Sequence, residues 1–344
     1  MPRSFLGEPI GRSGPSFIAT LPEMPGSKPF KRDQKSIRYM GPDIADLGGT
    51  LSAECDRERE DFVSGDGSQA SPRQVSCSDG ELRMDLGLKG KTALVLGGGG
   101  GLGRAIARSL AAEGANVAVA GIGSASIDGT VAELRAIGGK CIGLIWDLAD
   151  LSVINANILK IESELGPIDI LVNNTGGPPP ASAADLDPAL LAGQFQSMVL
   201  SVIAITDRVL SGMKSRGWGR ILTSTSSGVI APIPNLAISN ALRLSLVGWS
   251  KTLAREVGKE GITVNIVVPG RIATSRVAAL DNAKAKREGR SAEEVAAESQ
   301  GAIPLGRYGK PEEYADVVGF LASERAAYIT GSVIRVDGGL IPSI

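Results

Sequence analysis

From Lys91 to the C-terminus, short apolar runs alternate regularly with amphipathic stretches. The apolar runs have the length of buried strands. They cover residues 92–96, 116–120, 141–146, 168–172, 221–223, 263–268 and 332–336. Between them, apolar residues recur at helical spacing, as in residues 104–113, 154–165 and 242–257. Because apolar strands separated by helices are typical of a parallel sheet covered on both faces, we predict an α/β domain with a seven-stranded parallel sheet.

A glycine run, Gly97 to Gly101, joins the first predicted strand to the first predicted helix, and Gly103 follows it. Glycine allows positive φ and lets the backbone approach a pyrophosphate at a helix N-terminus. A glycine run alone also fits a structural turn, but its position between a strand and a helix favours nucleotide binding. We therefore predict a single Rossmann-type, doubly wound domain whose ligand lies beyond the carboxyl ends of the strands.

The composition excludes several kinds of chemistry. The chain of 344 residues contains no histidine, which rules out Ser-His-Asp and Cys-His catalysis and imidazole zinc sites. Three cysteines, Cys55, Cys77 and Cys141, form no CxxC pair, so we expect no metal site. A net charge of -1 gives no electrostatic reason to expect nucleic acid or an anionic membrane as a partner. No run of 18 apolar residues occurs, so we expect no membrane span and a cytoplasmic protein.

Residues 1–83 differ from the rest of the chain. They contain eight prolines and scattered charges, with no strand or helix period. Such a segment buries too little apolar area to offset its chain entropy, so we predict a disordered extension. Met84 stands just before the first strand pattern, and residues 84–344 have the size of one α/β domain. We interpret residues 1–83 as a dispensable extension or a mis-assigned start.

Residues 86–341 carry a series of motifs in a fixed order. After the glycine loop come Asp147-Leu148, Asn173-Asn174-Thr175-Gly176, Gly219-Arg220-Ile221, Ser226, Val264-Asn265 with Pro269-Gly270, residues 303–307 with 311–313, and residues 336–339. In this order they resemble the short-chain dehydrogenases/reductases, most closely the 3-oxoacyl-carrier-protein reductase type. The resemblance implies a homotetramer or homodimer, a nicotinamide cofactor, and hydride exchange at a small carbonyl or alcohol carbon.

The resemblance also implies cofactor contacts at the ends of the predicted strands. Asp147 is similar to the residue that holds the adenine ring, and the asparagine pair to a turn that contacts the adenosine ribose. The implied cofactor-binding residues are Gly97, Gly101, Leu102, Gly103, Asp147, Leu148, Asn173, Asn174, Pro269, Gly270, Ile272 and Thr274. The second strand ends without the acid typical of NAD-specific folds, which weakly favours NADP over NAD. No arginine is there either, so Ser124 or Ser126 would meet a 2′-phosphate.

The catalytic positions depart from the family pattern. Counting from Ser226, the position of the family's tyrosine acid is Ser239 and that of its lysine is Arg243. Met198 stands where the resemblance implies an asparagine. A serine hydroxyl is too weak an acid to replace a tuned phenol, while an arginine keeps its charge but does not release a proton. We take Ser226, Ser239 and Arg243 as the candidate catalytic residues, with Ser227 as an alternative partner for the substrate.

Two functions remain open on the sequence. The first is an NAD(P)-dependent oxidoreductase of the 3-oxoacyl reductase type in which water replaces the missing phenol. The second is a non-catalytic dinucleotide-binding protein, a sensor or assembly partner.

Two further segments also have two interpretations each. Residues 177–180, Gly-Pro-Pro-Pro, are either a wall of the site or a rigid surface loop. The charged residues 282–300 are either a substrate lid or a solvated helix face.

Overall fold

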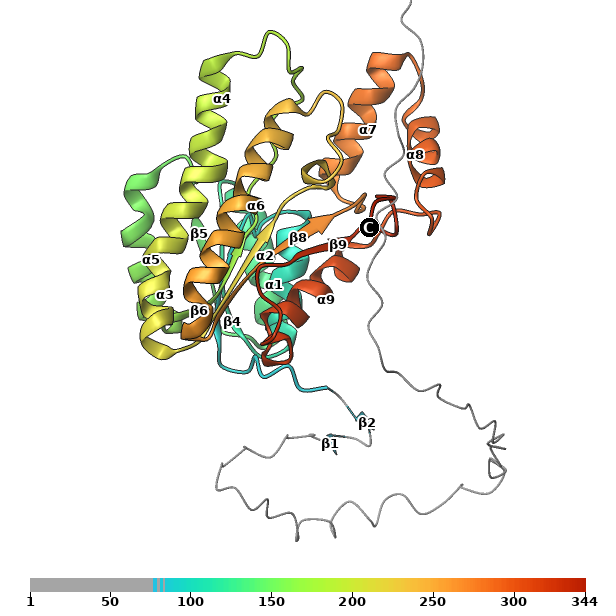
Figure 1. Ribbon diagram of the computed structural model, residues 1–344. Coiled ribbons are helices and arrows are strands. Elements are labelled where there is room, and N and C mark those ends of the chain that lie inside the picture. The colour runs from blue at the N-terminus through green and yellow to red at the C-terminus, as the bar shows by residue number, and fades with distance from the viewer. Residues whose placement is uncertain (1–76, 79–80, 83) are drawn as a thin grey trace, which may run out of the picture. The chain divides into compact units, whose positions relative to one another are not determined.

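The computed structural model describes residues 77–78, 81–82 and 84–344. Seven strands form one sheet in the order β5-β4-β3-β6-β7-β8-β9, and every neighbouring pair is parallel. The strands are β3 (Thr92–Leu96), β4 (Asn116–Gly121), β5 (Cys141–Ile145), β6 (Ile168–Asn173), β7 (Gly219–Ser224), β8 (Ile262–Pro269) and β9 (Val333–Val336). The predicted doubly wound α/β fold with a seven-stranded parallel sheet is therefore confirmed (Figure 1).

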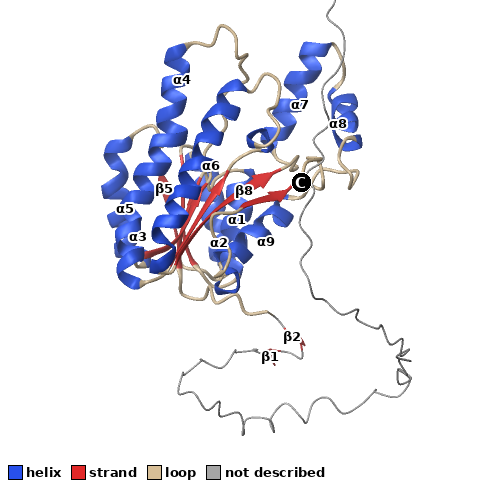
Figure 2. Cartoon of the chain, in the orientation of Figure 1, coloured by secondary structure: helices blue, strands red, loops and turns tan. Residues whose placement is uncertain are grey.

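Helices cover both faces of the sheet, as Figure 2 shows. The helices are α1 (Gly101–Ala112), α2 (Ser124–Ala136), α3 (Ile154–Leu165), α4 (Pro188–Phe195), α5 (Ser201–Arg216), α6 (Ala237–Val257), α7 (Ser275–Glu288), α8 (Ala292–Gly301) and α9 (Pro311–Ala322). Helices α1, α2 and α9 pack on one face, and α3, α5 and α6 pack on the other. The strands are consequently buried on both sides, which explains why they are continuously apolar.

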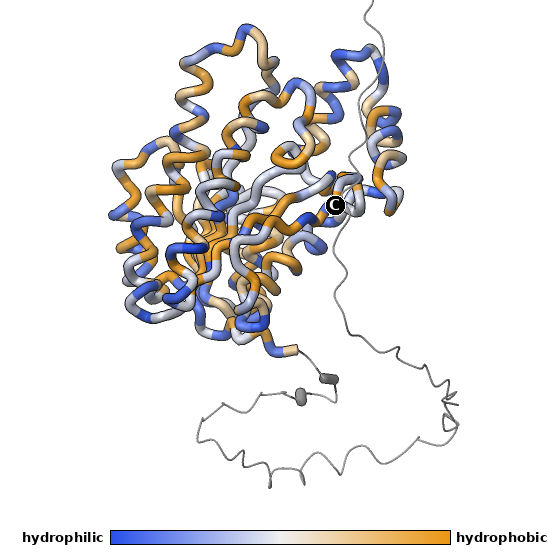
Figure 3. Tube along the Cα trace, in the orientation of Figure 1, coloured by the Kyte–Doolittle hydropathy of each residue, from blue (hydrophilic) through white to orange (hydrophobic). Residues whose placement is uncertain are grey.

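The two layers between sheet and helices form the core, and Figure 3 shows the hydrophobic segments gathered along the strands. Alternate residues of one strand serve opposite faces: Val95 packs with the α1 and α9 side, whereas Leu94 and Leu96 pack with the α3 and α5 side. A continuous helical stretch from Pro188 to Arg216 is, by length and composition, apolar enough to cross a membrane. Its α5 part instead buries Ile205, Val209 and Met213 against the sheet, as a core helix does.

Most of residues 1–83 lie outside the described residues, so the predicted disordered extension and the predicted boundary at residue 84 stay predictions. Within this segment, β1 (Cys77–Ser78) pairs with β2 (Glu81–Leu82) in antiparallel register. The chain then enters the sheet at its centre through β3 and moves outward to β5 before it returns to β6, next to β3. This reversal makes a topological switch point between β3 and β6, where ligands bind in such folds.

Candidate functional site

The glycine loop after β3 is packed against the turn after β6. Gly97 has a φ of +60°, and a Cβ built there would lie 2.4 Å from the carbonyl oxygen of Asn174. A Cβ on Gly103 would lie 2.1 Å from the carbonyl oxygen of Gly97. The Asn174 side chain donates from Nδ2 to the Leu96 carbonyl at 3.2 Å and so ties the loop to β6. At Gly97 and Gly103 this geometry leaves room for glycine only.

The residues present fit the phosphates of a dinucleotide. Helix α1 begins after Gly100, has no side-chain N-cap and carries no acid in its first turn, so its terminal amides are free for an anion. Thr274, from the turn after β8, lies directly against Gly101, where a Cβ would come within 2.8 Å of its Cγ2. Helix α2 likewise starts after Gly123 without a side-chain cap or an acid in its first turn. Ser124 and Ser126 beside this start are both exposed, and the Ser126 hydroxyl donates to the Gly123 carbonyl at 2.8 Å.

Other residues predicted to contact a cofactor also follow strand ends. Asp147 comes just after β5, and its exposed carboxylate accepts from the Ala149 amide at 2.9 Å, which shapes the turn. Leu148 beside it packs against the core between the sheet and α3. Asn173, the last residue of β6, donates from Nδ2 towards the hydroxyls of Thr206 and Thr223 and so links β6 to α5 and β7.

The turn after β8 is held by its neighbours. A Cβ on Gly270 would lie 2.5 Å from the Cα of Asp337, because this turn runs close to the end of β9. Ile272 is buried and pairs as an isolated bridge with Gly309, in the loop before α9. Pro269 ends β8, and Thr274 caps α7 by accepting from the Val277 amide at 3.4 Å. The turn therefore has one defined position relative to the glycine loop.

Ser226 and Ser239 occupy different elements at this edge of the sheet. Ser226 follows β7, and its Oγ accepts from the Gly228 amide at 3.2 Å, which caps a short 3-10 helix. Since the Oγ accepts this bond, the hydroxyl proton stays available for a ligand oxygen. Ser239 lies in the first turn of α6, is buried, and is one helical turn before Arg243, so both lie on one face of α6.

Arg243 is a buried cation whose donors go to the backbone. Nη1 donates to the Ser224 carbonyl at 3.1 Å, and Nη2 donates to the carbonyls of Thr175 at 3.4 Å and Gly176 at 3.0 Å. No carboxylate pairs with it within the described part of the chain. Burial lowers the pKa of Arg243 to about 10. Tyr314 acts to raise this pKa, and the charge of Arg276 acts to lower it further. Arg243 thus joins the ends of β6 and β7 to α6.

With this geometry established, comparisons with known proteins assign the family. A family model described as enoyl-(acyl carrier protein) reductase matches residues 98–341. The 3-oxoacyl-(acyl-carrier-protein) reductase FabG of Escherichia coli is 38% identical over 258 residues, which cover 74% of this chain and 99% of that protein. The chain belongs to the short-chain dehydrogenase/reductase family.

Further relatives of this short-chain dehydrogenase/reductase agree with that assignment. Nodulation protein G of Azospirillum brasilense is 34% identical over 251 residues, covering 73% of this chain and 98% of that protein. Among solved structures, L-sorbose reductase from Gluconobacter frateurii, complexed with NADPH and L-sorbose, is 30% identical with a TM-score of 0.72 and covers 76% of this chain and 100% of that one. YwfH, an NADPH-dependent reductase involved in bacilysin biosynthesis, is 30% identical with a TM-score of 0.71, covering 74% and 99% of the two chains.

Sequence position places none of the four tyrosines of this short-chain dehydrogenase/reductase between β7 and α6, yet the fold brings one of them to the end of β7. Tyr314, in α9, is fully buried, and its Oη lies 2.8 Å from Ser224 Oγ and 3.2 Å from the Val267 carbonyl oxygen. Burial raises the pKa of Tyr314 above its ordinary value, although Ser224 and the charge of Arg243 act in the opposite direction. The signal that could have found it is its place on the apolar face of α9, because a buried phenol needs a partner.

Met198 lies where the family resemblance implies an asparagine. It is part of a π-helical turn, Gln196–Leu200, between α4 and α5, and it is 2% exposed. Its side chain belongs to an apolar cluster with Ile238 and Leu242 of α6. The structure therefore places an apolar contact at this position, beside the helix that carries Ser239.

Helices α7 and α8, which contain the charged segment 282–300, lie above the carboxyl ends of β8 and β9 (Figure 1). Glu298 of α8 accepts from Lys284 of α7 at 2.9 Å, so part of the charge pairs between the two helices. Asp281 of α7 is buried and accepts from Arg271 at 2.7 Å and from the Tyr308 hydroxyl at 2.7 Å. These bonds attach α7 to the turn after β8 and to the loop before α9.

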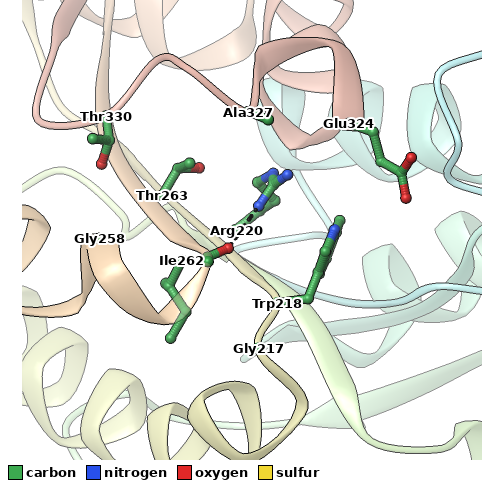
Figure 4. Close-up of a pocket in the computed structure, with 10 residues that line it drawn as sticks. Gly217, Trp218, Arg220, Gly258, Ile262, Thr263, Glu324, Ala327 and Thr330 are labelled. Carbon is green, nitrogen blue, oxygen red and sulfur yellow. Dashed lines mark hydrogen bonds between the residues drawn. The ribbon is translucent and has the colours of Figure 1, made fainter. Parts of the chain in front are cut away.

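A separate cavity of about 400 Å³ lies at the opposite edge of the sheet, where β7 and β8 begin (Figure 4). Arg220 is buried there, stacks on Trp218 at 4.3 Å from the ring centroid, and donates to the carbonyls of Ser323 and Gly261. Its Nε and Nη1 atoms donate to backbone carbonyls, and none of the predicted site residues lines this cavity. Arg220 therefore joins the start of β7 to neighbouring segments.

Proposed function

We propose that this protein is an NADP-dependent oxidoreductase that transfers hydride between nicotinamide and a small carbonyl or alcohol substrate, of the 3-oxoacyl reductase type. The observation that carries the proposal is the joint position of the glycine loop, the Asn174 turn and the Thr274 turn, which leave an uncapped helix N-terminus between them. The relatives described as NADPH-dependent or complexed with NADPH support the choice of cofactor.

Several residues would hold the dinucleotide. The amides at the start of α1 would bind the pyrophosphate, Asp147 and Leu148 would contact the adenine, and the turn from Pro269 to Thr274 would contact the nicotinamide. The start of α2, without an acid, accommodates a 2′-phosphate and supports NADP over NAD. When bound, the nicotinamide supplies or accepts the hydride.

The polar residues of the site orient the substrate oxygen. Ser226 donates its hydroxyl proton to this oxygen while its Oγ accepts from the Gly228 amide, and Ser239 supplies a second hydroxyl. Arg243 keeps the ends of β6 and β7 in place and contributes positive charge near an oxygen that becomes negative. The proton comes from water, since no phenol replaces the family's tyrosine at position 239. Loss of a general acid typically costs about 10²–10⁴-fold in rate, while positioning still provides acceleration.

A second candidate function is a non-catalytic dinucleotide-binding protein that acts as a sensor or assembly partner. The observation that favours it is the use of Arg243 donors by three backbone carbonyls, which leaves this residue with a structural task. Under either function we propose a cytoplasmic homotetramer or homodimer that binds neither nucleic acid nor membrane.

One experiment separates the two functions. NADPH and NADH are titrated by fluorescence, and ketones and 3-oxoacyl thioesters are then assayed with catalytic amounts of protein. For the oxidoreductase we expect turnover that falls about 10²-fold in Ser226→Ala at unchanged NADPH affinity. Ser227→Ala is the matched control, and a larger loss there would make Ser227 the substrate's partner. Tight binding of NADPH without turnover of any compound would favour the second function. Failure of both nucleotides to bind at millimolar concentration would refute both.

A further inference from the structure

A second arginine contacts the segment that Arg243 holds. Arg276, in the first turn of α7, donates from Nη2 to the Pro178 carbonyl at 2.6 Å. Its guanidinium lies over Gly177, where a Cβ would come within 2.9 Å of Nη2 and 3.1 Å of Nε. A residue with a side chain at Gly177 would displace the guanidinium. Two guanidinium groups, from α6 and α7, therefore meet the backbone of residues 175–178 after β6.

Positive charge accumulates here without a compensating acid. In the described residues neither Arg243 nor Arg276 takes part in an ion pair with a carboxylate. The first turn of α7 contains no acidic residue, and a cation at a helix N-terminus meets the positive end of the helix dipole. The two arginines also act on each other, because Arg276 helps to lower the pKa of Arg243. Negative charge on a ligand would reduce this repulsion.

Arg276 has the means to bind such a charge. It is exposed, and one bond to Pro178 uses one of its five N–H donors. Nη2 carries two N–H groups and gives one to Pro178. Its other N–H forms, with Nε or Nη1, a fork that matches the two oxygens of a carboxylate. Its backbone partner, Pro178, lies two residues beyond Gly176, which accepts from Arg243.

We propose that the carbonyl substrate carries an anionic group, a carboxylate or an equivalent oxyanion, which Arg276 binds beside the Gly177–Pro178 segment. Arg276 is then the specificity-determining residue of the site, and the enzyme prefers oxo acids to the corresponding neutral esters. The inference rests on the proposed oxidoreductase function for its substrate. Binding of the anion itself can be measured without turnover, so the two can fail separately.

The test compares acetoacetate with methyl acetoacetate, and 2-oxobutanoate with its methyl ester. Each compound is titrated into the protein–NADPH complex by fluorescence and is also assayed for NADPH oxidation. The variants are Arg276→Met, which removes the charge at similar volume, and Arg276→Lys, which keeps the charge without the planar fork. Arg287→Met removes an arginine near the other end of the same helix and is the matched control.

We expect the wild-type complex to bind at least one acid more tightly than its ester. Arg276→Met should weaken binding of the acid, and raise its KM, about 10- to 100-fold, and leave the ester unchanged. Arg276→Lys should recover part of the difference, and Arg287→Met should behave as the wild type. Binding of the acid without hydride transfer would support the anion site and contradict the proposed oxidoreductase.

Three results would overturn the proposal. The wild-type complex could show no preference for either acid over its ester, or Arg276→Met could weaken acid and ester equally. The third is a fall of NADPH affinity in Arg276→Met by the same factor as the affinity for the acid. In that case the anion that Arg276 binds would be a phosphate of the cofactor.

Discussion

Replacement of Gly103 by alanine tests whether the glycine loop is shaped for a dinucleotide. In this variant the new Cβ would lie 2.1 Å from the Gly97 carbonyl oxygen and 3.0 Å from Asn174 Nδ2. An ordinary carbon–oxygen contact is about 3.3 Å, so the loop and α1 must separate by about 1 Å. Gly100→Ala is the matched control, because a Cβ there meets no atom within 4 Å and the φ of -127° suits alanine.

The magnitude follows from two opposing effects on stability. Overpacking costs about 1–3 kcal/mol, and alanine gains about 0.5–1 kcal/mol over glycine inside a helix. We therefore expect Gly103→Ala to lower the free energy of unfolding by up to about 2.5 kcal/mol. The displaced loop should also lose hydrogen bonds to the cofactor phosphates, each of which is charge-assisted. NADPH affinity should consequently fall about 10- to 100-fold.

The assay combines urea unfolding, followed by circular dichroism, with fluorescence titration of NADPH for the wild type and both variants. Gly100→Ala should keep NADPH affinity within about twofold, while its weaker helix cap costs at most about 1 kcal/mol. Wild-type affinity in Gly103→Ala would refute the assignment of this loop to the cofactor. So would an equal loss of affinity in both variants, because the close approach of Gly103 to Gly97 would then not be the cause.

Three further predictions concern the phenol, the cofactor and the pair α7–α8. Tyr314→Phe should lower the free energy of unfolding by about 1–3 kcal/mol, because buried Ser224 Oγ and the Val267 carbonyl lose a partner. Because folding raises the pKa of Tyr314, the free energy of unfolding of the wild type should fall as the pH rises above the ordinary tyrosine pKa. Tyr314→Phe lacks this contribution, so its free energy of unfolding, measured in urea from pH 7 upward, should fall less than that of the wild type. Ile122→Asp adds an acid at the exposed end of β4, so NADPH affinity should fall at least about tenfold relative to NADH in parallel fluorescence titrations, and an unchanged ratio would place the 2′-phosphate elsewhere. Hydrogen bonds from Lys284, and then from Arg290, lower the pKa of Glu298 to about 2. The contribution of the Glu298 carboxylate to stability is therefore complete above the ordinary glutamate pKa and is lost as the pH falls towards 2. Thermal unfolding should therefore separate wild type from Glu298→Gln at neutral pH, with the gap closing below about pH 4 and shrinking in high salt; a gap independent of pH would contradict the ion-pair origin.

Much of the site's framework could be predicted because its signals are local. The period of apolar residues depends on which face of a strand or helix is buried, and the glycine loop depends on positive φ at Gly97. Strand ends were less predictable where polar residues are buried. The fifth predicted strand, residues 221–223, is in fact Gly219–Ser224, because Arg220 is buried inside the sheet with its donors on backbone carbonyls.

The sequence by itself determined the fold class and the order of the motifs along the chain. It also determined where Ser226, Ser239 and Arg243 stand relative to the predicted strands and helices. The tertiary structure alone decided which groups those residues meet. Tyr314 lies 90 residues from Ser224, and Arg276 lies 98 residues from Pro178, yet each pair is hydrogen-bonded. Periodicity and turn chemistry act over a few residues, whereas a buried donor takes whichever acceptor the packed strand ends present. For that reason the charge of Arg243 was readable from the sequence, but its three carbonyl partners were not.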